Sequence, residues 1–321
     1  MKSIKKLFIK LFPCLYYKLY VIVKTHKANK VKNKKLFCIE KYKKRFGALI
    51  DLDNPKTFYE KLNYLRLFWD SEQSKELVDK HLVKEYLLNK GYGKFIAKEI
   101  AYFESFADFK KAFVSIANQH HRFVVKLAHT SGDVFFFDNW KWRDKHGFKT
   151  SKRSVFSCLS NKIKYNYYCE NFENPYIHLK GSIIIEEYLP SLSSHGLNEF
   201  KIFCNYGKPI LINYVEGRQN KTHVTECFLY SDLRNTHYKQ NQNTFDFERL
   251  EQDVPYKEMM DFCKNTCSEF PLVRVDLLLN KNSFMFCEFT FYDCGGYNIF
   301  TPGEANLKLG SLIDISAISN N

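Results

Sequence analysis

The chain has 321 residues, of which 45% are hydrophobic and 17% aromatic, so it can bury the core of one large α/β enzyme or two modest domains. Its formal net charge of +14 comes from residues 1–45, where fifteen Lys and Arg face a single acid, Glu40. Subtracting these from the totals of 49 basic and 35 acidic residues leaves 34 of each, so the rest of the chain is neutral. A neutral body lacks the basic excess that follows a phosphate backbone, which argues against nucleic-acid binding.

Residues 1–45 mix bulky apolar side chains with lysine. Lys10, Pro13 and Lys18 interrupt the apolar run, so a membrane-spanning helix of about 18 apolar residues is not expected. The small-residue cleavage site of a signal peptide is also missing, and we expect a cytoplasmic protein. Two interpretations stay open. Residues 1–45 are either a basic amphipathic segment on the anionic inner face of the plasma membrane, or a packing helix followed by a solvated lysine run.

The ten cysteines do not form a recognisable metal or redox motif. No CxxC pair occurs, and Cys263 and Cys267 stand one helical turn apart without a second ligand pair at zinc spacing. We therefore expect reduced thiols in the core.

The predicted elements alternate between helix and strand before residue 181 and are mostly strands after it. In chain order they are helices over 57–68 and 74–90, a strand over 95–100, a helix over 109–116, a hairpin of strands over 122–128 and 134–137, a polar loop over 140–149, a helix over 154–168, strands over 183–188, 199–205 and 209–215, a helix over 256–267, strands over 272–279 and 283–291, and a helix over 305–313. This mixture predicts an α+β fold of small lobes around a cleft. The predicted regions are 1–45, 46–120, 121–190 and 191–321.

The strongest local signal is a pair of acids on two neighbouring strands. Asp276 in Val273-Arg-Val-Asp276 and Glu288 in Cys287-Glu-Phe-Thr290 each interrupt an apolar strand, and a tight turn joins the two strands. Because side chains in a strand repeat every two residues, Arg274 and Thr290 share the face of these acids. Two carboxylates on adjacent strands can hold a hard cation such as Mg²⁺. The alternative is a buried Arg–carboxylate pair with one spare acid.

Two weaker signals point to a nucleotide. Lys126 projects from a buried strand into a turn that contains Ser131 and Gly132, where it could contact a phosphate; the alternative is a lysine that snorkels at a strand end. The residues that follow the next buried strand, Glu186 to Leu189, could present backbone groups to an adenine edge, although any strand leading into a loop would look the same.

In their order along the chain, these motifs resemble those of the ATP-grasp enzymes. Their residues are similar to those of the TupA-like branch, which is named for teichuronopeptide synthesis. The matching pieces are Asn54-Pro-Lys-Thr-Phe-Tyr-Glu-Lys61, Val78-Asp-Lys-His-Leu-Val-Lys84, Phe123-Val-Val-Lys126, Ile185-Glu-Glu-Tyr188, Phe200-Lys-Ile-Phe203, Val273-Arg-Val-Asp276, Glu288-Phe-Thr-Phe291, Phe300-Thr-Pro302 and Leu307-Lys-Leu-Gly310. The resemblance covers about 54 to 312. It implies two α+β lobes that clasp ATP, with a lid lobe over 121–190 and a C-terminal lobe carrying the metal site over 191–321.

The resemblance also implies roles for individual residues. Phosphate contacts would come from Lys84, Lys126 and Lys201, with Lys80 as a weaker candidate, and from the Ser131-Gly132 loop. The adenine would meet Glu186, Glu187, Tyr188 and Leu189, and the ribose Glu199. Magnesium would be held by Asp276, Glu288 and Thr290, and Arg274 would steady the acyl phosphate and the tetrahedral species that follows it. Two features depart from the usual pattern: Thr290 stands where most ATP-grasp enzymes have Asn, and the loop over 129–133 has only one glycine.

The implied activity is that of an ATP- and Mg²⁺-dependent carboxylate–amine ligase. The resemblance suggests that it adds an amino acid or amine to a uronic acid or similar carboxylate during capsule, O-antigen or other surface polysaccharide synthesis. A glycosyltransferase of the same pathways and a non-catalytic membrane-associated scaffold are the competing interpretations. The first would turn over UDP-sugars, and the second leaves Lys126, Asp276 and Glu288 without a purpose.

Overall fold

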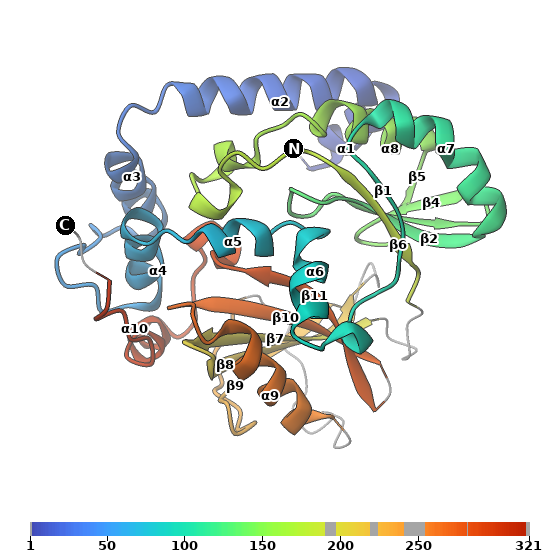
Figure 1. The fold of residues 1–321 in the computed structure, drawn as a ribbon. Helices are drawn as coiled ribbons and strands as arrows, with labels where there is room; N and C mark the ends of the chain where they lie inside the picture. The colour runs from blue at the N-terminus through green and yellow to red at the C-terminus, as the bar shows by residue number, and fades with distance from the viewer. Residues whose placement is uncertain (1, 190–196, 219–223, 241–253, 281, 319–321) are drawn as a thin grey trace.

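The computed structural model describes residues 2–189, 197–218, 224–240, 254–280 and 282–318 (Figure 1). Its α-helices are α1 (Lys2–Leu11), α2 (Pro13–Asn29), α3 (Lys34–Phe46), α4 (Phe58–Phe68), α5 (Glu72–Leu77), α6 (Leu82–Asn89), α7 (Phe106–Gln119), α8 (Lys152–Lys162), α9 (Tyr256–Cys267) and α10 (Glu304–Gly310). Short 3-10 helices are η1 (Gly93–Phe95), η2 (Tyr167–Glu170), η3 (Asn174–Tyr176) and η5 (Asp293–Gly296). Helices and antiparallel sheets together confirm the predicted α+β class.

The first sheet has six strands in the order β1-β6-β2-β3-β4-β5. They are β1 (Glu99–Phe103), β2 (Arg122–Leu127), β3 (Val134–Asp138), β4 (Lys141–Asp144), β5 (Lys149–Thr150) and β6 (Ile183–Glu187). Helices α7 and α8 pack on one face, where Phe113, Phe123 and Val155 belong to one buried cluster. The sheet thus takes β1 from the region over 46–120 and the other strands from the region over 121–190.

The second sheet has five strands in the order β11-β10-β7-β8-β9. They are β7 (Leu197–Asn205), β8 (Lys208–Arg218), β9 (Thr225–Leu229), β10 (Val273–Asn280) and β11 (Ser283–Thr290). A larger buried cluster surrounds it, and it includes Phe200 and Val275 from the sheet, Phe262 from α9 and Phe58 from α4. Each sheet is therefore supported by its own buried cluster. Residues of both sheets line the space between them.

Four predicted elements differ most from the structure, and local hydrogen bonds explain two of these differences. The helix predicted over 74–90 is broken because the Asp79 carboxylate accepts from the backbone N–H groups of His81 and Leu82 and starts a new helix, α6. The helix predicted over 154–168 ends at Lys162, and Asn166 caps the separate turn η2. The polar loop over 140–149 contains the strands β4 and β5, and the strand predicted over 95–100 lies at β1.

The N-terminal helices form a strap along the outside of both lobes (Figure 1). Helix α2 packs along α8 and η2, where Tyr20 and Lys24 both bind the Glu170 carboxylate. Helix α3 packs beside α4, and Arg45 donates from Nε to the carbonyl of Tyr297 at 2.8 Å. One side of this segment therefore packs on the body, and apolar side chains such as Leu15, Leu19 and Ile22 stay exposed on α2.

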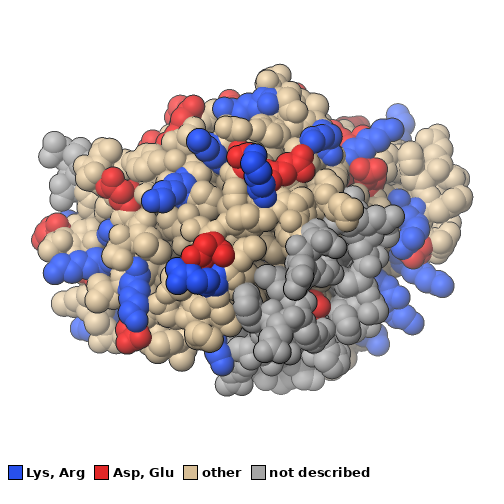
Figure 2. All heavy atoms as spheres, turned by 90° about the horizontal axis from the view of Figure 1, so that it is seen from below, with Lys and Arg blue, Asp and Glu red and all other residues tan. Residues whose placement is uncertain are grey.

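Charge of one sign does not dominate the face of the molecule seen in Figure 2. On the face shown in Figure 2, basic and acidic side chains are interspersed over the described residues. Within the described chain, no helix combines the length and the apolar character that crossing a bilayer requires.

Candidate active site

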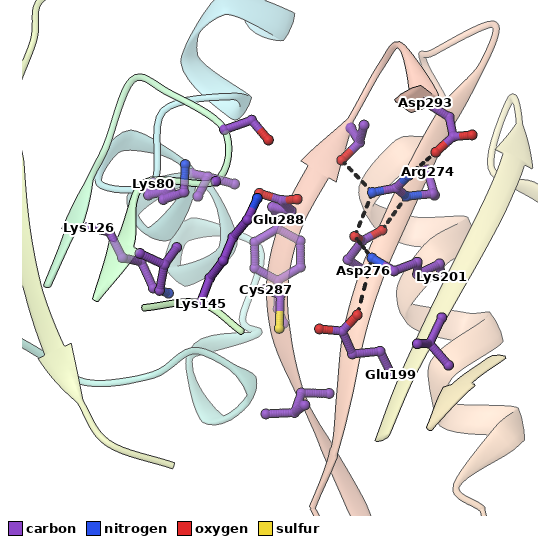
Figure 3. A pocket seen from close by; sticks show the side chains of 18 of the residues that line it. Lys80, Lys126, Lys145, Glu199, Lys201, Arg274, Asp276, Cys287, Glu288 and Asp293 are labelled. Carbon is purple, nitrogen blue, oxygen red and sulfur yellow. Dashed lines mark hydrogen bonds and ion pairs between the residues drawn. The ribbon is translucent and has the colours of Figure 1, made fainter. Parts of the chain in front are cut away.

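A cavity of about 740 Å³ lies where the two sheets face each other. Figure 3 shows its interior, with Lys80 and Lys126 on one side and Arg274, Asp276 and Glu288 on the other. The first side comes from β2, β6 and α6, and the second side from β7, β10 and β11. Residues far apart in the sequence thus meet in one cavity.

Two lysines on the first side converge on one buried carboxylate. Glu186 of β6 is only 4% exposed. The Nζ of Lys84 lies 2.6 Å from its Oε1, and the Nζ of Lys126 binds its Oε2. Burial alone would raise the pKa of Glu186, but the ammonium groups of Lys126 and Lys84 lower it to about 2. Two cations on one anion leave a net positive charge facing the cavity.

The third lysine, Lys80, supports the turn between β2 and β3. It lies in the break between α5 and α6, and its Nζ donates to the carbonyls of Ala128 and Thr130. Burial lowers its pKa. Because it holds the start of the turn, Lys80 positions Ser131 and Gly132, which line the cavity. We call Lys80, Lys84 and Lys126 the lysine cluster.

The turn also brings in a cation that we did not predict. Gly132 has φ +85°, and a Cβ at this position would lie 2.5 Å from the Nζ of Lys145. Lys145 stands in the turn between β4 and β5 and lines the cavity. In Figure 3 its side chain extends across the cavity toward the strand that carries Glu288. Glycine at 132 therefore makes room for a lysine beside the loop.

The end of β6 and the two residues that follow it reach the cavity with only some of their side chains. Glu187 and Leu189 line it, and the Glu187 carboxylate accepts from the backbone N–H of Lys98 at 2.9 Å. Tyr188 instead packs edge-on against Phe136 and beneath the guanidinium of Arg122. Apolar side chains line the same end of the cavity, namely Val83, Ile96, Val124, Val134, Phe136, Val215, Leu278 and Phe286. This end is suited to a flat apolar group.

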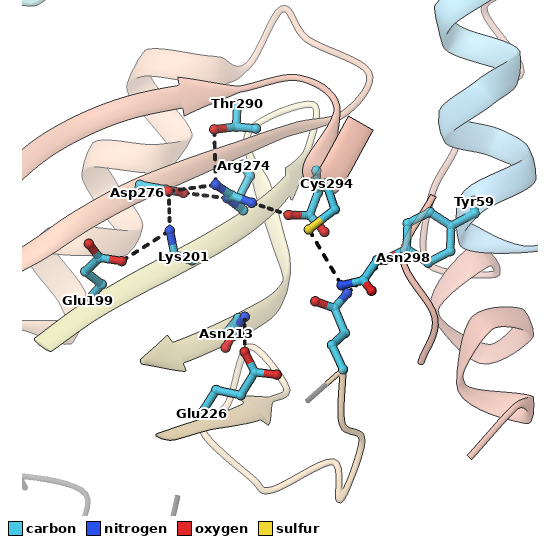
Figure 4. Close-up of polar contacts among 12 residues, drawn as sticks. Tyr59, Glu199, Lys201, Asn213, Glu226, Arg274, Asp276, Thr290, Cys294 and Asn298 are labelled. Atoms are coloured by element: carbon cyan, nitrogen blue, oxygen red, sulfur yellow. Dashed lines mark hydrogen bonds and ion pairs between the residues drawn. The ribbon is translucent and has the colours of Figure 1, made fainter. Parts of the chain in front are cut away.

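On the second side, Arg274 is the centre of a network of ion pairs, drawn in Figure 4. It donates from Nε and Nη2 to the two carboxylate oxygens of Asp276 at 2.6 and 2.8 Å, and from Nη2 to Thr290 Oγ1 at 3.2 Å. Nη1 binds Asp293, and Lys201 binds Asp276 from the other side. We call these five residues the Arg274 network. Burial would raise the pKa of Asp276, yet Arg274 and Lys201 lower it to about 2.

The second predicted metal ligand, Glu288, lies opposite Asp276. The two are paired across β10 and β11, as Arg274 is paired with Thr290, so all four side chains share one face as expected. In the described chain the Glu288 carboxylate forms no ion pair or hydrogen bond. No cluster of three or more His, Cys, Asp or Glu with metal-binding geometry occurs among the described residues. Mg²⁺ fits this donor set, because it commonly takes one or two carboxylates and completes its octahedron with water and substrate phosphates.

Strand β7 adds Glu199 and Lys201 beside Asp276. The Nζ of Lys201 lies 3.2 Å from Glu199 Oε2, so the lysine bridges two carboxylates. On the neighbouring strands Asn213 donates to Glu226 Oε2 at 3.5 Å, and both residues line the cavity. The structure thus brings every predicted site residue to the cavity except the side chain of Tyr188.

Sequence reasoning missed several polar lining residues, among them Lys145, Glu173 and Asp293. Lys145 stands in a stretch predicted as polar loop, and Glu173 lies in a loop with no sequence signal. Asp293 begins η5, where Cys294, Gly295 and Gly296 all have positive φ. The pair of glycines close after Glu288 was the available hint that this turn folds back on the site.

The family model described as TupA-like ATPgrasp matches residues 60–314. No curated protein matches the chain.

Three solved structures are similar to this chain at low identity. D-alanine–D-alanine ligase from Helicobacter pylori is 14% identical, with 81% of this chain and 67% of that chain covered and a TM-score of 0.42. Cdc123 from Schizosaccharomyces pombe is 11% identical, with 78% and 96% covered and a TM-score of 0.44. The D-cycloserine synthetase DcsG is 14% identical, with 74% and 69% covered and a TM-score of 0.35.

Proposed function

Because the chain belongs to the TupA-like ATP-grasp family, we propose that it is an ATP- and Mg²⁺-dependent ligase that joins a carboxylate to an amine through an acyl phosphate. The observation that carries this proposal is one cavity with the lysine cluster on one side and the Arg274 network with Glu288 on the other. The first side suits phosphates and the second suits a divalent cation, and ATP with Mg²⁺ needs both.

The nucleotide would lie with its adenine at the apolar end of the cavity, near Glu187 and Leu189. Its phosphates would lie along Lys84 and Lys126, with the loop amides at Ser131 and Gly132 beside them. Lys84 and Lys126 are at present bound to Glu186. The single carboxylate of Glu186 neutralises only one of the two lysine charges. The lysine pair can therefore attract phosphate while Glu186 keeps both ammonium groups in place.

Magnesium would be held by Asp276 and Glu288, with Thr290 beside them, and would supply charge neutralisation on the phosphates. In the proposed reaction, a substrate carboxylate oxygen attacks the γ-phosphorus, and the bond to the β–γ bridging oxygen breaks to release ADP. The amine nitrogen then attacks the acyl carbon, phosphate leaves and the nitrogen loses a proton. Arg274 faces the charge that develops in these steps.

The carboxylate and the amine are proposed to belong to surface polysaccharide synthesis. The support is the TupA-like family itself, which resembles the enzymes of teichuronopeptide synthesis, and a uronic acid or similar carboxylate would be the group that ATP activates. Mass spectrometry of the host's surface polysaccharide with and without this protein would identify the linkage.

The deciding experiment on the activity is a binding comparison. Calorimetry should detect ATP with Mg²⁺ and no UDP-sugar, and carboxylate- and amine-dependent ADP release should follow. Tight UDP-sugar binding without ATP binding would establish the glycosyltransferase alternative and sink the ligase.

We further propose that the outward side of α2 lies on an anionic membrane surface. Tyr17 and Tyr20 face the body, but Leu15, Leu19 and Ile22 are 48%, 44% and 51% exposed. They are spaced four and three residues apart, which places them on one face of the helix. Exposed lysines occur on α2 and on the residues just before and after it, namely Lys10, Lys18, Lys27, Lys30, Lys32, Lys34 and Lys35. An apolar stripe bordered by cations and almost free of acids is complementary to anionic lipid.

Vesicle sedimentation tests this surface. The double variant Leu19→Gln/Ile22→Gln and deletion of about residues 1–35 should both reduce binding to vesicles that contain phosphatidylglycerol, and salt should weaken wild-type binding. Leu88→Gln is the matched control, because Leu88 is 57% exposed and lies on α6. Equal vesicle binding by the double variant and the wild type would refute the proposal, whereas a change in oligomeric state would assign the face to a second copy.

A further inference from the structure

One end of the cavity is lined by side chains that have no role in the proposed binding of the phosphates or the metal ion. Its lining includes Tyr167, Asn171, Glu173, Tyr176 and Tyr292. These residues come from η2, η3, the loop between them and the start of the turn after β11. The wall is thus made of phenol rings, an amide and one carboxylate.

Glu173 is the unusual member of this wall. Its side chain lines the cavity, yet the residue is only 7% exposed. Within the described chain it forms no ion pair, and its hydrogen bond comes from Asn171 Nδ2 to Oε1 at 3.1 Å. A buried carboxylate without a bound cation is costly. A cationic ligand in the cavity would remove that cost.

The two nearby cations are held by other partners. Arg66 donates from Nη2 to the carbonyl of Gly295 at 2.6 Å and from Nη1 to the carbonyl of Asn171 at 3.2 Å. Lys41 binds Asn171 Oδ1 and lies 4.2 Å from the centre of the Tyr297 ring. Both favour the ionised form of Glu173, but burial outweighs them and raises its pKa. They stabilise the loop behind Glu173 and leave its cavity side open.

The rings beside Glu173 suit an ammonium group as well. Tyr167 and Tyr176 pack at 61° with their centres 4.7 Å apart, and the backbone N–H of Tyr176 donates to the carbonyl of Glu173 at 3.0 Å. An ammonium group gains both from a carboxylate and from the face of an aromatic ring. Tyr176 also lines the same cavity as Arg274 and Glu288.

We propose that Glu173, with Tyr167 and Tyr176, forms the subsite that binds the acceptor amine in its ammonium form, as an amino acid or an amino sugar. The inference rests on the proposed ligase function and names the residues that select its second substrate. Binding there holds the amine next to the Arg274 network, at the side of the cavity where the acyl phosphate would form.

Calorimetry with matched probes on the full-length protein tests the subsite, with and without ADP and Mg²⁺. D-Glucosamine is compared with N-acetyl-D-glucosamine, and L-alanine with N-acetyl-L-alanine, so that each pair differs in the ammonium charge. At least one free amine should bind tenfold or more tightly than its acetylated partner, and the pair that does so distinguishes an amino sugar from an amino acid.

Variants then assign the effect to the wall. Glu173→Gln keeps an oxygen for Asn171 and should weaken amine binding at least tenfold, with ATP affinity within twofold of the wild type. Tyr176→Leu should weaken it several-fold, and Tyr176→Phe should retain it because the ring face remains. Glu269→Gln is the matched control, since Glu269 is exposed and lies outside the cavity lining.

The outcomes separate this inference from the proposed function. If the protein binds ATP with Mg²⁺ but free and acetylated amines bind equally, or Glu173→Gln binds amines like the wild type, the subsite is wrong and the ligase proposal stands. If Glu173→Gln only lowers the unfolding temperature and leaves amine affinity unchanged, Glu173 is a structural counter-charge to Arg66. If ATP does not bind, the amine measurements without nucleotide still decide the subsite.

Discussion

The two sides of the cavity hold their charges in opposite ways. In the lysine cluster, Lys84 and Lys126 share one anion, Glu186, so positive charge is in excess. On the second side, Arg274 and Lys201 meet Asp276, Asp293 and Glu199, and Glu288 adds a carboxylate without a described partner. The comparison shows that internal ion pairs hold the side chains of each side in place. The first side nevertheless keeps an excess of positive charge, and the second side an excess of negative charge. Phosphates and a divalent cation would match these two surpluses.

The substitution with the largest expected effect on this charge difference removes the carboxylate of Glu288. Glu288→Gln keeps the volume and loses the charge, so Mg²⁺ loses one of its two proposed carboxylate ligands. A metal ion supplies several kcal/mol to phosphoryl transfer, so we expect ADP release to fall about 10³-fold and Mg²⁺-dependent ATP affinity to fall with it. Coupled ADP assays over a magnesium titration measure both. Wild-type magnesium dependence in the variant would remove Glu288 from the metal site.

The next largest effect should separate binding from chemistry on the same side. Arg274→Lys keeps one positive charge but loses the planar fork that holds both oxygens of Asp276. We expect ATP affinity near the wild-type value and turnover about 10²-fold lower, the scale of one lost oxyanion contact.

The structure also supports a simpler role for Arg274, since it pairs with Asp276 and Asp293. If that pairing is its whole contribution, the melting temperature and ATP affinity should fall together and the rate should fall no further than they explain. Turnover at the wild-type rate would show that the catalytic role assigned to Arg274 is wrong.

Acid should lower the stability that Glu186 contributes on the first side of the cavity. Lysines hold the pKa of Glu186 at about 2, below its ordinary value of 4.5, so its ionised form is the one that folding favours. Its contribution is complete above about pH 4.5 and is lost as the pH falls toward 2, and it is on the order of a few kcal/mol. Glu186→Gln should flatten the loss of stability over this range, measured by denaturant unfolding at several pH values. Glu104→Gln, an exposed change of the same kind, should leave the acid dependence as it is in the wild type.

The smallest effect concerns the exposed lysine beside the loop. Lys145→Ala removes a cation next to Gly132 that is not buried, so solvent screens its charge. We expect ATP to bind roughly two- to fivefold more weakly, by calorimetry, with turnover of bound ATP little changed. Lys149→Ala in the same hairpin lies outside this cavity and should not change ATP affinity. A similar loss in both variants would point to the hairpin's stability instead of a phosphate contact.

Local sequence patterns predicted the parts of the site that one hairpin builds. The alternation in Val273–Asp276 and Glu288–Phe291 predicted that Asp276 and Glu288 share one face of a hairpin. Their direct pairing also depends on a register shift between Asp276 and Leu277, which the sequence pattern did not predict. The contact of Lys84 with Glu186 could not be predicted from periodicity, because it needs α6 to dock on β6. Asp293 was not predicted for the same reason, because its turn is held by tertiary contacts such as the hydrogen bond from Arg66 to the carbonyl of Gly295.

The N-terminal strap has a mechanical consequence. Helix α2 is fixed to the first sheet's lobe through Glu170, and α3 is fixed to the second through Arg45 and Tyr297. Only residues 30–33 join the two helices, and the chain from Asn29 to Lys34 can extend to no more than about 18 Å. The lobes therefore cannot separate freely at this edge. If the lobes open, we expect the cavity to widen mainly on the side farthest from residues 30–33.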